Sequence, residues 1–316
     1  MTTMERALMA AAAPPAQKRK LSLAARHQER AAWSFLAPWF VGMLAITAFP
    51  MVASLYLSFT DYNLLKPPEF IGLENYADML NDPRLAKSLG VTFTYVFLGV
   101  PLLMAAALGL AIMLNRGIRG LAIYRSVYYL PSLLGGSVAV GILWRQLFGT
   151  EGLVNQFLAL FGIDGPGWIS DPDTALGTLV ALHVWTFGSA MVIFLAGLRQ
   201  IPEMYYEAAS IDGAGRWRQF RSITLPLLSP IIFFNLILQI IGSFQTFTQA
   251  FIVSGGSGGP ADSTLFYTLY LYQEGFGKRD MGYASAMAWF LLLIIAVFTA
   301  VNFIASKHWV FYSDRD

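Results

Sequence analysis

The sequence has no cysteine among its 316 residues, which excludes disulfides, thiolate metal sites and cysteine nucleophiles. Charge is scarce as well, because Asp, Glu, Lys and Arg make up only 13% of the chain, about half of their usual share in soluble domains. A chain so poor in charge cannot cover itself with a surface that faces water. The net charge of +2 gives no indication of nucleic-acid binding.

The usual markers of catalysis are also missing. The three histidines, His27, His183 and His308, are scattered, and no His/Asp/Glu cluster has metal-ligand spacing. The glycine-rich stretch 254–264 is not a Walker loop, since no Gly-Lys-Ser/Thr ends it. We therefore expect no catalytic residue, metal or cofactor in this chain, and a membrane-embedded enzyme would need a clustered catalytic set that is not visible.

What the chain has in abundance is apolar residues, which make up 56% of it, with a mean hydropathy of +0.55. Their long runs predict an all-helical membrane protein with several spans. Pro50 predicts a kink in the first span, and Pro131 with the Gly135–Gly136 pair predicts bends in the third. A short helix is expected at 153–161. The six predicted spans are roughly 35–59, 91–114, 123–148, 174–198, 227–253 and 283–303.

The distribution of charge predicts the orientation of these spans. With the N-terminus in the cytoplasm, the inner segments hold 15 of the 21 Lys and Arg residues, and the outer segments hold 12 of the 19 acidic residues. This bias follows the positive-inside rule and places both termini in the cytoplasm. Residues 1–32 are expected to form a basic, partly disordered cytoplasmic tail, since the alanine-rich run 7–13 is too weakly apolar for a signal peptide. The predicted membrane domain is 33–306, and 307–316 is a second cytoplasmic tail.

The segment 207–230, which reads EAASIDGAGRWRQFRSITLPLLSP, lies between two apolar runs on the predicted cytoplasmic side. It begins with the composition of a short helix. Gly213 and Gly215 then weaken the helix by about 1 kcal/mol each relative to alanine, and Pro226 marks a break before the next span. Arginines alternate with Trp217 and Phe220 between these points. A short helix with a carboxylate and aromatic neighbours suits docking to another protein.

This segment resembles the coupling motif of the permeases of ABC importers, EAA followed by G and then by I-x-LP. The form found in sugar importers adds further positions, and the sequence 70–80, FIGLENYADML, resembles another element of the same permeases, F-x-GL-x-NY. NR-x-x-RG, YLP and W-R-x-LF elements follow within 115–153, and a GGP-x-x-x-T loop within 254–264. The resemblance extends from about Trp33 to Phe303. The matching coupling residues are Glu207, Ala208, Ala209, Asp212, Gly213, Ala214, Phe220, Ile223, Leu225, Pro226 and Pro230.

The resemblance implies a type I ABC importer permease fold in a bacterial or archaeal inner membrane. It also implies partners: a second homologous permease, two ATPase subunits that carry ATP and Mg, and an extracytoplasmic solute-binding protein that delivers a sugar. Glu207 would face a basic residue of an ATPase subunit, and Ala208 and Ala209 would allow close approach. Trp217 and Phe220 would anchor the segment against the permease core, or simply pack there. Alternating access driven by ATP on the partners is the implied mechanism.

The fifth span carries a polar stripe. Asn235, Gln239, Ser243 and Thr246 follow helical spacing on one face, and Gln245 lies beside them. Polar side chains at membrane depth usually face the bundle interior or an aqueous path, and amides and hydroxyls suit the hydroxyl groups of a neutral sugar. Such residues also form hydrogen bonds between helices, so the stripe fits either a sugar path or helix packing. Trp185 in the fourth span is a candidate for stacking on a sugar ring.

A secondary transporter of a small polar solute is the alternative function. It predicts paired carboxylates within the membrane or an internally repeated bundle. No Asp or Glu lies deep within any of the six predicted spans, which argues against it. No arginine lies deep in a span either, so the sequence favours a neutral glycan over a phosphorylated one.

Overall fold

The computed structural model describes residues 23–116 and 120–311, so most of the predicted N-terminal tail and the end of the C-terminal tail lie outside the described residues. Contacts divide the chain into two units, one that ends at Ser54 and one that begins at Leu55. The first unit contains α2 (Leu23–Gly42), a π-helical segment (Met43–Ala48) and the start of α3 (Phe49–Leu57). Pro50 lies in the first turn of α3, two residues beyond the π-helical segment, and the kink predicted there stays a prediction.

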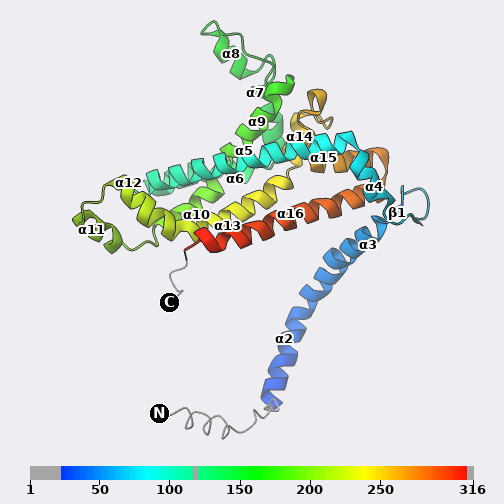
Figure 1. Cartoon of the computed structure of the whole chain (residues 1–316), viewed down its shortest axis with the longest axis horizontal. Coiled ribbons are helices and arrows are strands. Elements are labelled where there is room, and N and C mark those ends of the chain that lie inside the picture. Colours follow the sequence, from blue (N-terminus) through cyan, green and yellow to red (C-terminus); the bar gives the residue numbers. More distant parts are fainter. Residues whose placement is uncertain (1–22, 117–119, 312–316) are drawn as a thin grey trace. The chain divides into compact units, whose positions relative to one another are not determined.

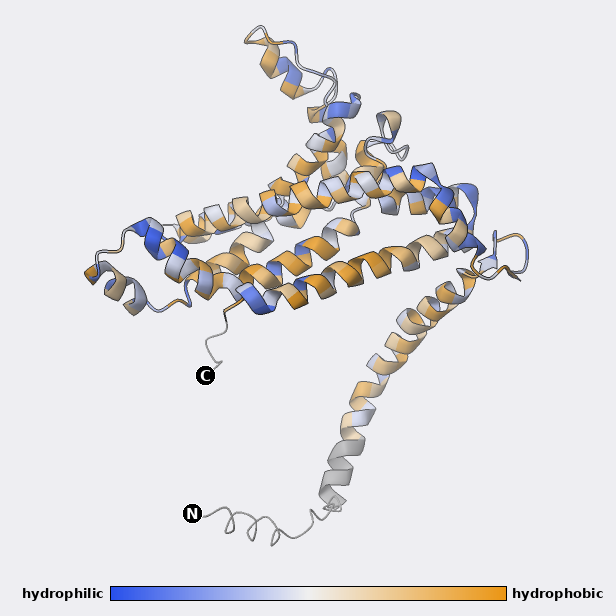
Figure 2. Ribbon diagram, in the orientation of Figure 1, coloured by the Kyte–Doolittle hydropathy of each residue, from blue (hydrophilic) through white to orange (hydrophobic). Residues whose placement is uncertain are grey.

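The second unit is built on three long helices, α5 (Pro83–Leu114), α13 (Leu225–Phe244) and α16 (Met281–Trp309). Helix α13 packs against both α5 and α16, and Figure 1 shows the three helices extending along a common direction. Their side chains are mainly apolar, whereas hydrophilic residues gather at the two ends of these helices (Figure 2). This pattern is the one expected of helices that cross an apolar layer.

Two further spans are broken. Helices α6 (Leu121–Leu134) and α7 (Val138–Leu147) meet at an angle of 97°, and α9 (Pro172–Trp185) and α10 (Gly188–Leu198) meet at 41°. The first break lies at Gly135–Ser137, where the sequence predicts a bend, and Ser137 caps the N-terminus of α7 by accepting a hydrogen bond from the Val140 amide. Irregular backbone at membrane depth is tolerated where it is buried in protein or lines an aqueous cavity.

Shorter elements connect the long ones. Beyond α3 they include the paired strands β1 (Thr60–Asp61) and β2 (Glu69–Phe70) and the helix α4 (Glu74–Asn81). The helix α8 (Leu153–Ala159) confirms the one expected at 153–161. The remaining short elements are α11 (Met204–Ile211), α12 (Arg216–Gln219), a π-helical segment (Phe220–Thr224), α14 (Thr248–Val253), a 3-10 turn (Pro260–Asp262), α15 (Tyr267–Tyr272) and a second π-helical segment (Gln273–Lys278).

The second unit has two hydrophobic clusters. One surrounds the fully buried side chains of Phe244, Phe266 and Tyr267, and the other surrounds Leu103 and Phe194. Glycines allow the helices to approach closely: a Cβ at Gly99 of α5 would lie 2.9 Å from Cδ2 of His183 in α9. Such small residues at helix contacts are typical of membrane bundles.

The structure confirms long apolar helices in the predicted regions and corrects some of their bounds. In the described residues, four continuous helices are long and apolar enough to cross a membrane, and each bent pair adds one more span if it crosses as a unit. Helix α5 begins at Pro83 instead of 91, because Asp82 caps it. The predicted fifth span is divided, since α13 ends at Phe244 and α14 begins only at Thr248.

Candidate functional site

The segment Met204–Thr224, here called the bracket, contains α11, α12 and the turn between them. Helix α11 ends in a Schellman motif: the Gly213 amide donates to the Ser210 carbonyl at 3.1 Å, and the Ala214 amide donates to the Ala209 carbonyl at 2.8 Å. Gly213 has φ +74°, a conformation that glycine adopts without a steric penalty. The glycine of the coupling motif therefore ends the helix and turns the chain towards α12.

Side chains fix the two arms of the bracket. The Gln219 amide nitrogen of α12 donates to the Ser210 hydroxyl at 2.9 Å and to the Ala214 carbonyl at 3.0 Å. The hydroxyl groups of Tyr206 and Thr224 lie 2.9 Å apart, which joins α11 to the beginning of α13. A displacement of α11 would therefore be transmitted to the long helix α13 through Tyr206 and Thr224.

The outer surface of the bracket is exposed and combines apolar with charged side chains. Glu207 and Ala208 are exposed, and Ile211 and Trp217 retain 88% and 73% of their accessible surface. The expectation that Trp217 packs against the core of this chain is wrong, since its ring contacts Phe220 at a centroid distance of 5.5 Å but stays mostly open. Large exposed apolar side chains next to a carboxylate suit a docking surface for another protein.

The other residues that match the motif lie behind this surface or in the turn. Ala209, Ala214, Phe220 and Ile223 are half-buried, whereas Asp212 and Gly213 are exposed in the turn. Leu225 and Pro226 follow the π-helical segment directly, and Arg216–Phe244 is one continuous helix, so the break expected at Pro226 is wrong. Behind the bracket is a cavity of about 640 Å³ lined by the end of α5, the end of α10 and residues of the bracket. The inner side of the bracket is therefore only partly packed against α5 and α10.

The polar stripe of α13 is divided between buried and accessible residues. Asn235 and Ser243 are each 1% exposed and are satisfied within the chain, Asn235 by the Ile231 carbonyl at 3.1 Å and Ser243 by Nε2 of His183 at 3.2 Å. Gln239 and Thr246 are half-buried, and Gln245 is exposed beyond the end of α13. Only part of the stripe is therefore accessible in this conformation.

Trp185 belongs to a series of aromatic rings. It retains 38% of its surface and lies 6.2 Å from Trp144, which lies 4.8 Å from Phe148; Phe148 in turn lies 6.2 Å from Trp168. The Trp144 indole donates to the Thr178 carbonyl at 3.1 Å, which fixes α7 to α9. The sequence analysis proposes only Trp185 as a stacking residue. The other three rings lie next to it because of the fold.

A second polar site, here called the Asp82 cluster, lies at the opposite end of α5. One carboxylate oxygen of Asp82 accepts hydrogen bonds from the amides of Arg84 and Leu85, and the other accepts from the hydroxyls of Tyr270 and Tyr283 at 2.6 and 2.7 Å. Burial opposes ionisation of Asp82, but these four donors outweigh it and lower the pKa of its carboxyl group. Asp82 thus joins the beginnings of α5 and α16 to α15.

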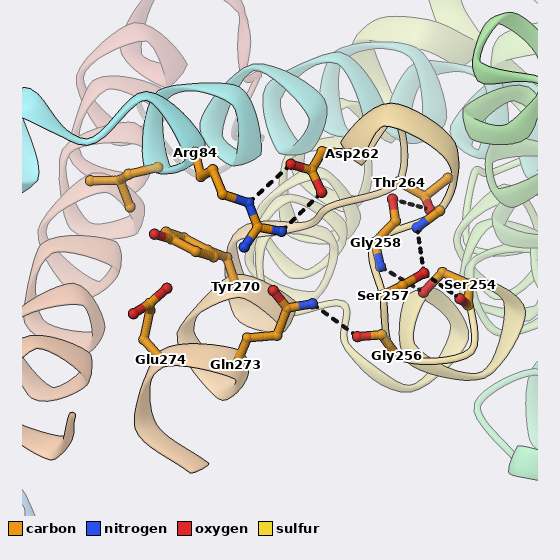
Figure 3. Close-up of polar contacts among 12 residues, drawn as sticks. Arg84, Ser254, Gly256, Ser257, Gly258, Asp262, Thr264, Tyr270, Gln273 and Glu274 are labelled. Atoms are coloured by element: carbon orange, nitrogen blue, oxygen red, sulfur yellow. Dashed lines mark hydrogen bonds and ion pairs between the residues drawn. The ribbon is translucent and has the colours of Figure 1, made fainter. Parts of the chain in front are cut away.

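The same cluster holds the glycine-rich loop 254–264 (Figure 3). Arg84 forms a two-pronged ion pair with Asp262 at 2.9 and 3.0 Å, and its guanidinium lies 5.2 Å from the centre of the Tyr270 ring. The Gln273 amide donates to the Gly256 carbonyl at 2.9 Å, and the Thr264 hydroxyl donates to the Gly258 carbonyl at 2.8 Å. The sequence places none of these contacts, although the Asp-Pro pair at 82–83 is a recognisable helix start.

Within the described residues no group of three or more His, Cys, Asp or Glu side chains is placed to hold a metal ion. The arrangement thus offers two ends with different properties. One end presents the exposed bracket joined to α13, and the other is closed by a network of hydrogen bonds and an ion pair.

Comparison with known proteins gives consistent results. The model of the family described as "binding-protein-dependent transport system inner membrane component" matches residues 76–309. A probable ABC transporter permease, YesP of Bacillus subtilis, is 51% identical over 94% of this chain and 97% of its own length. The lactose transport permease LacF of Rhizobium radiobacter is 33% identical over 89% and 96%. A chain of a bacterial alginate ABC transporter, solved with an alginate-bound periplasmic protein, has the same fold, with a TM-score of 0.77 at 20% identity over 89% and 95%.

Proposed function

Because this chain belongs to the family of binding-protein-dependent transport system inner membrane components, the permease subunits of ABC transporters, we propose that it forms half of the translocation path of an ATP-driven sugar importer. It is a multi-pass membrane protein, and ATP hydrolysis belongs to partner subunits. The permeases named for lactose and for arabinooligosaccharides are 33% identical to it over most of the chain, which supports a sugar as substrate.

The bracket carries this proposal. Its exposed face, centred on Glu207, Ala208 and Ile211, docks to an ATPase subunit, and Trp217 extends the contact to α12. The hydrogen bond between Tyr206 and Thr224 passes the resulting displacement to α13, which carries the polar stripe. Closure of two ATPase subunits would then bring two such brackets together and reopen the path at the opposite end.

The assembly in this proposal has a second homologous permease, two ATPase subunits with ATP and Mg, and an extracytoplasmic binding protein. The bracket and both termini lie in the cytoplasm of a bacterial or archaeal cell, six spans cross the inner membrane, and the Asp82 cluster faces outward. The charge distribution supports this orientation. The chain divides into a basic tail of residues 1–32, a membrane domain of residues 33–306 and a tail of residues 307–316.

The substrate path in this proposal follows α13 and α9. Gln239, Gln245, Thr246 and Trp185 supply accessible groups, and Asn235 and Ser243 support the helix from the buried side. Replacing Gln239 by leucine removes an amide while keeping the side-chain volume similar. We expect it to reduce sugar uptake while assembly and ATP hydrolysis stay intact, and a failure to assemble would instead assign this residue to helix packing.

Reconstitution tests the function as a whole. The chain is purified with its genomic neighbours, inserted into liposomes with ATP inside, and supplied outside with its binding protein and labelled sugars. Accumulation that requires both ATP and the binding protein is the expected result. Uptake that follows a proton or sodium gradient without any ATPase partner would favour the secondary transporter.

A further inference from the structure

Three of the predicted spans are broken, and their breaks lie against one another. The breaks are at 135–137 between α6 and α7, at 186–187 between α9 and α10, and at 245–247 between α13 and α14. The first two are in direct contact, because a Cβ at Gly135 would collide with Cγ2 of Thr186. The side-chain amide of Gln249, at the beginning of α14, donates to the Gly135 carbonyl at 3.2 Å and so joins the third break to the first.

Helices α7, α9 and α14, here called the α7–α9–α14 group, are fixed to one another on one side of the breaks. Helix α7 packs closely against α14, since a Cβ at Gly141 would lie 2.9 Å from Cβ of Ile252. The Trp144 indole of α7 donates to the Thr178 carbonyl of α9 at 3.1 Å. Figure 1 shows α7 turning away from the direction that α5, α13 and α16 share. These contacts make the three helices one body.

Helices α6, α10 and α13 form a second group on the other side of the breaks. A Cβ at Gly188 of α10 would lie 2.8 Å from Cα of Tyr129 in α6, and a Cβ at Gly197 would lie 2.9 Å from Cδ1 of Leu228 in α13. Such close approach at small residues is typical of helices that pack tightly in membranes. The unbroken helix α5 packs against α9 as well as α10 and α13, so it contacts both groups.

We propose that the three breaks act as one hinge, about which the α7–α9–α14 group turns as a single body in each transport cycle. Gln249 is the positioning residue that holds this hinge in the conformation described here. The inference rests on the proposed function and adds the part of the chain that moves. Hinges consist of a few residues at the ends of elements, often small ones, that absorb the change in backbone angles. Gly135 and Gly136 provide such residues at the 97° break.

Two side-chain hydrogen bonds between helices cross the breaks within the described residues. One is the bond from Gln249 to Gly135, and the other joins Ser243 of α13 to Nε2 of His183 in α9 at 3.2 Å. The first matters for the backbone, because α6 ends at Leu134 and a carbonyl left without a partner at membrane depth is costly. At 3.2 Å it lies at the upper end of the usual range. It therefore stabilises this conformation without preventing its exchange for another.

Helix α13 connects the hinge to the bracket. Arg216–Phe244 is one continuous helix, with the hydrogen bond between Thr224 and Tyr206 near its beginning and the break at 245–247 at its end. A displacement of the bracket that moves α13 therefore reaches the hinge through a single helix. This connection gives the α7–α9–α14 group a route by which events at the ATPase subunits can turn it.

The test uses the complete reconstituted importer with pairs of spin-labelled cysteines, which the lack of native cysteine allows. Labels at Ile123 of α6 and Leu143 of α7, two exposed residues on opposite sides of the 97° break, report the hinge. Labels at Leu143 and Ala181 lie within the α7–α9–α14 group and serve as the control. Between the nucleotide-free and the vanadate-trapped importer, we expect the first distance to shift and the second to stay constant.

Gln249→Leu removes the amide donor and keeps a similar side-chain volume. Without nucleotide, we expect it to shift the ratio of the two populations seen with the Ile123–Leu143 labels about fivefold towards the trapped one, as the loss of one hydrogen bond predicts. ATP hydrolysis without the binding protein should rise as well. Gln273→Leu is the matched control, since the Gln273 amide also donates to a backbone carbonyl, that of Gly256 at 2.9 Å, but lies away from the breaks. It should change neither quantity.

Three results would overturn this inference: an Ile123–Leu143 distance that is the same in both states, a Leu143–Ala181 distance that changes as much, or equal population shifts in Gln249→Leu and Gln273→Leu. The labelled pairs with Gln249 intact test the hinge even where Gln249→Leu fails to assemble. A failure to import any sugar with ATP and the binding protein would instead defeat the proposed function, so the two failures are distinguishable.

Discussion

The bracket and the Asp82 cluster differ in how their polar groups are used. In the bracket the hydrogen bonds are few and internal, the cavity behind it is open, and the face around Glu207 is exposed. In the Asp82 cluster a single carboxylate accepts four hydrogen bonds, and an ion pair holds the adjoining loop. The first site is suited to contact with a partner and to movement, and the second is suited to holding three helices together.

This contrast predicts that mutations in the bracket change transport without changing stability, whereas mutations in the Asp82 cluster do the opposite.

Glu207→Lys should have the largest effect. Charge reversal in a docking contact replaces attraction by repulsion, and loss of one member of a buried charged pair in an interface costs about 2–5 kcal/mol of binding. We expect transport and ATPase recruitment to be lost, while thermal unfolding of the purified chain stays unchanged because Glu207 is exposed. Normal transport in the reconstituted Glu207→Lys assembly would remove the main support for the coupling role.

Asp82→Asn should lower the stability of the chain by about 2–3 kcal/mol, because hydrogen bonds to a charged acceptor each contribute about 1.5–3 kcal/mol and an amide keeps only part of them. Thermal unfolding in detergent measures this loss. ATPase recruitment should be unaffected in the folded fraction, and a selective loss of recruitment would contradict the division between the two sites.

The pH dependence of stability gives a second test of the same cluster. The pKa of Asp82 is lowered below its ordinary value of 3.8, so its contribution is present above pH 3.8 and is lost as the pH falls through the lower value in the folded state. The pKa of Asp280 is shifted in the opposite direction. Burial raises it, and the nearby Glu274 and Asp61 add to this rise, while the Tyr283 amide and Lys278 act against it. Stability should therefore rise as the pH falls through the raised value towards 3.8.

Asp280→Asn separates these two contributions. Asparagine also caps helices, so the cap that Asp280 provides to the Tyr283 amide should survive the change. We expect the variant to lose the rise in stability just above pH 3.8 and to keep the loss at lower pH that Asp82 causes. An unchanged profile, measured by thermal unfolding across pH 3 to 7, would contradict the assignment to Asp280.

Arg84→Gln should lower the stability of the chain by a smaller amount, about 1 kcal/mol. The Arg84 and Asp262 side chains retain 40% and 29% of their accessible surface, so water screens the ion pair. A double-mutant cycle with Asp262→Asn isolates the pairwise energy. The coupling should shrink at high salt, and a coupling energy of zero would show that other contacts alone hold the glycine-rich loop.

Trp217→Ala should change stability least, by less than about 0.5 kcal/mol, since the ring is 73% exposed. It should nevertheless weaken ATPase binding, because aromatic residues are over-represented among the residues that dominate interfaces. Tyr206→Phe is a useful companion, since it removes only the hydroxyl that contacts Thr224 and should reduce transport without reducing binding.

The sequence predicts the helical class, the bend at Gly135–Gly136 and the weakening of the helix at Gly213, because each depends on local features, namely hydropathy, glycine and proline. Hydropathy does not show where α13 ends, since the residues from 245 to 253 remain mostly apolar while the chain turns at Gln245. The Asp82 cluster could not be predicted from sequence either. Its members, from Asp82 to Tyr283, are up to 201 positions apart and meet only through packing.

The candidate site divides in the same way. The bracket is a continuous segment, so its residues are recognisable together, and the coupling role of Glu207 remains a prediction that the structure makes physically reasonable. Trp217 is expected to pack against the core, yet its ring is largely exposed. The sequence alone does not distinguish an aromatic residue that packs within the chain from one on the surface. Likewise, the stripe of α13 shares one helix face, yet neighbouring helices cover Asn235 and Ser243 and leave Gln239 partly open.

The central claim is that the bracket binds an ATPase subunit, and a site-specific cross-link measures this most directly. The chain has no native cysteine, so a single cysteine at Glu207, with one at Asp171 as the control, can be joined to purified ATPase subunits by a short thiol-reactive photo-cross-linker. We predict a cross-linked product from position 207 that changes in yield with ATP, and none from position 171. A product from position 171 alone, or equal products from both, would contradict the account.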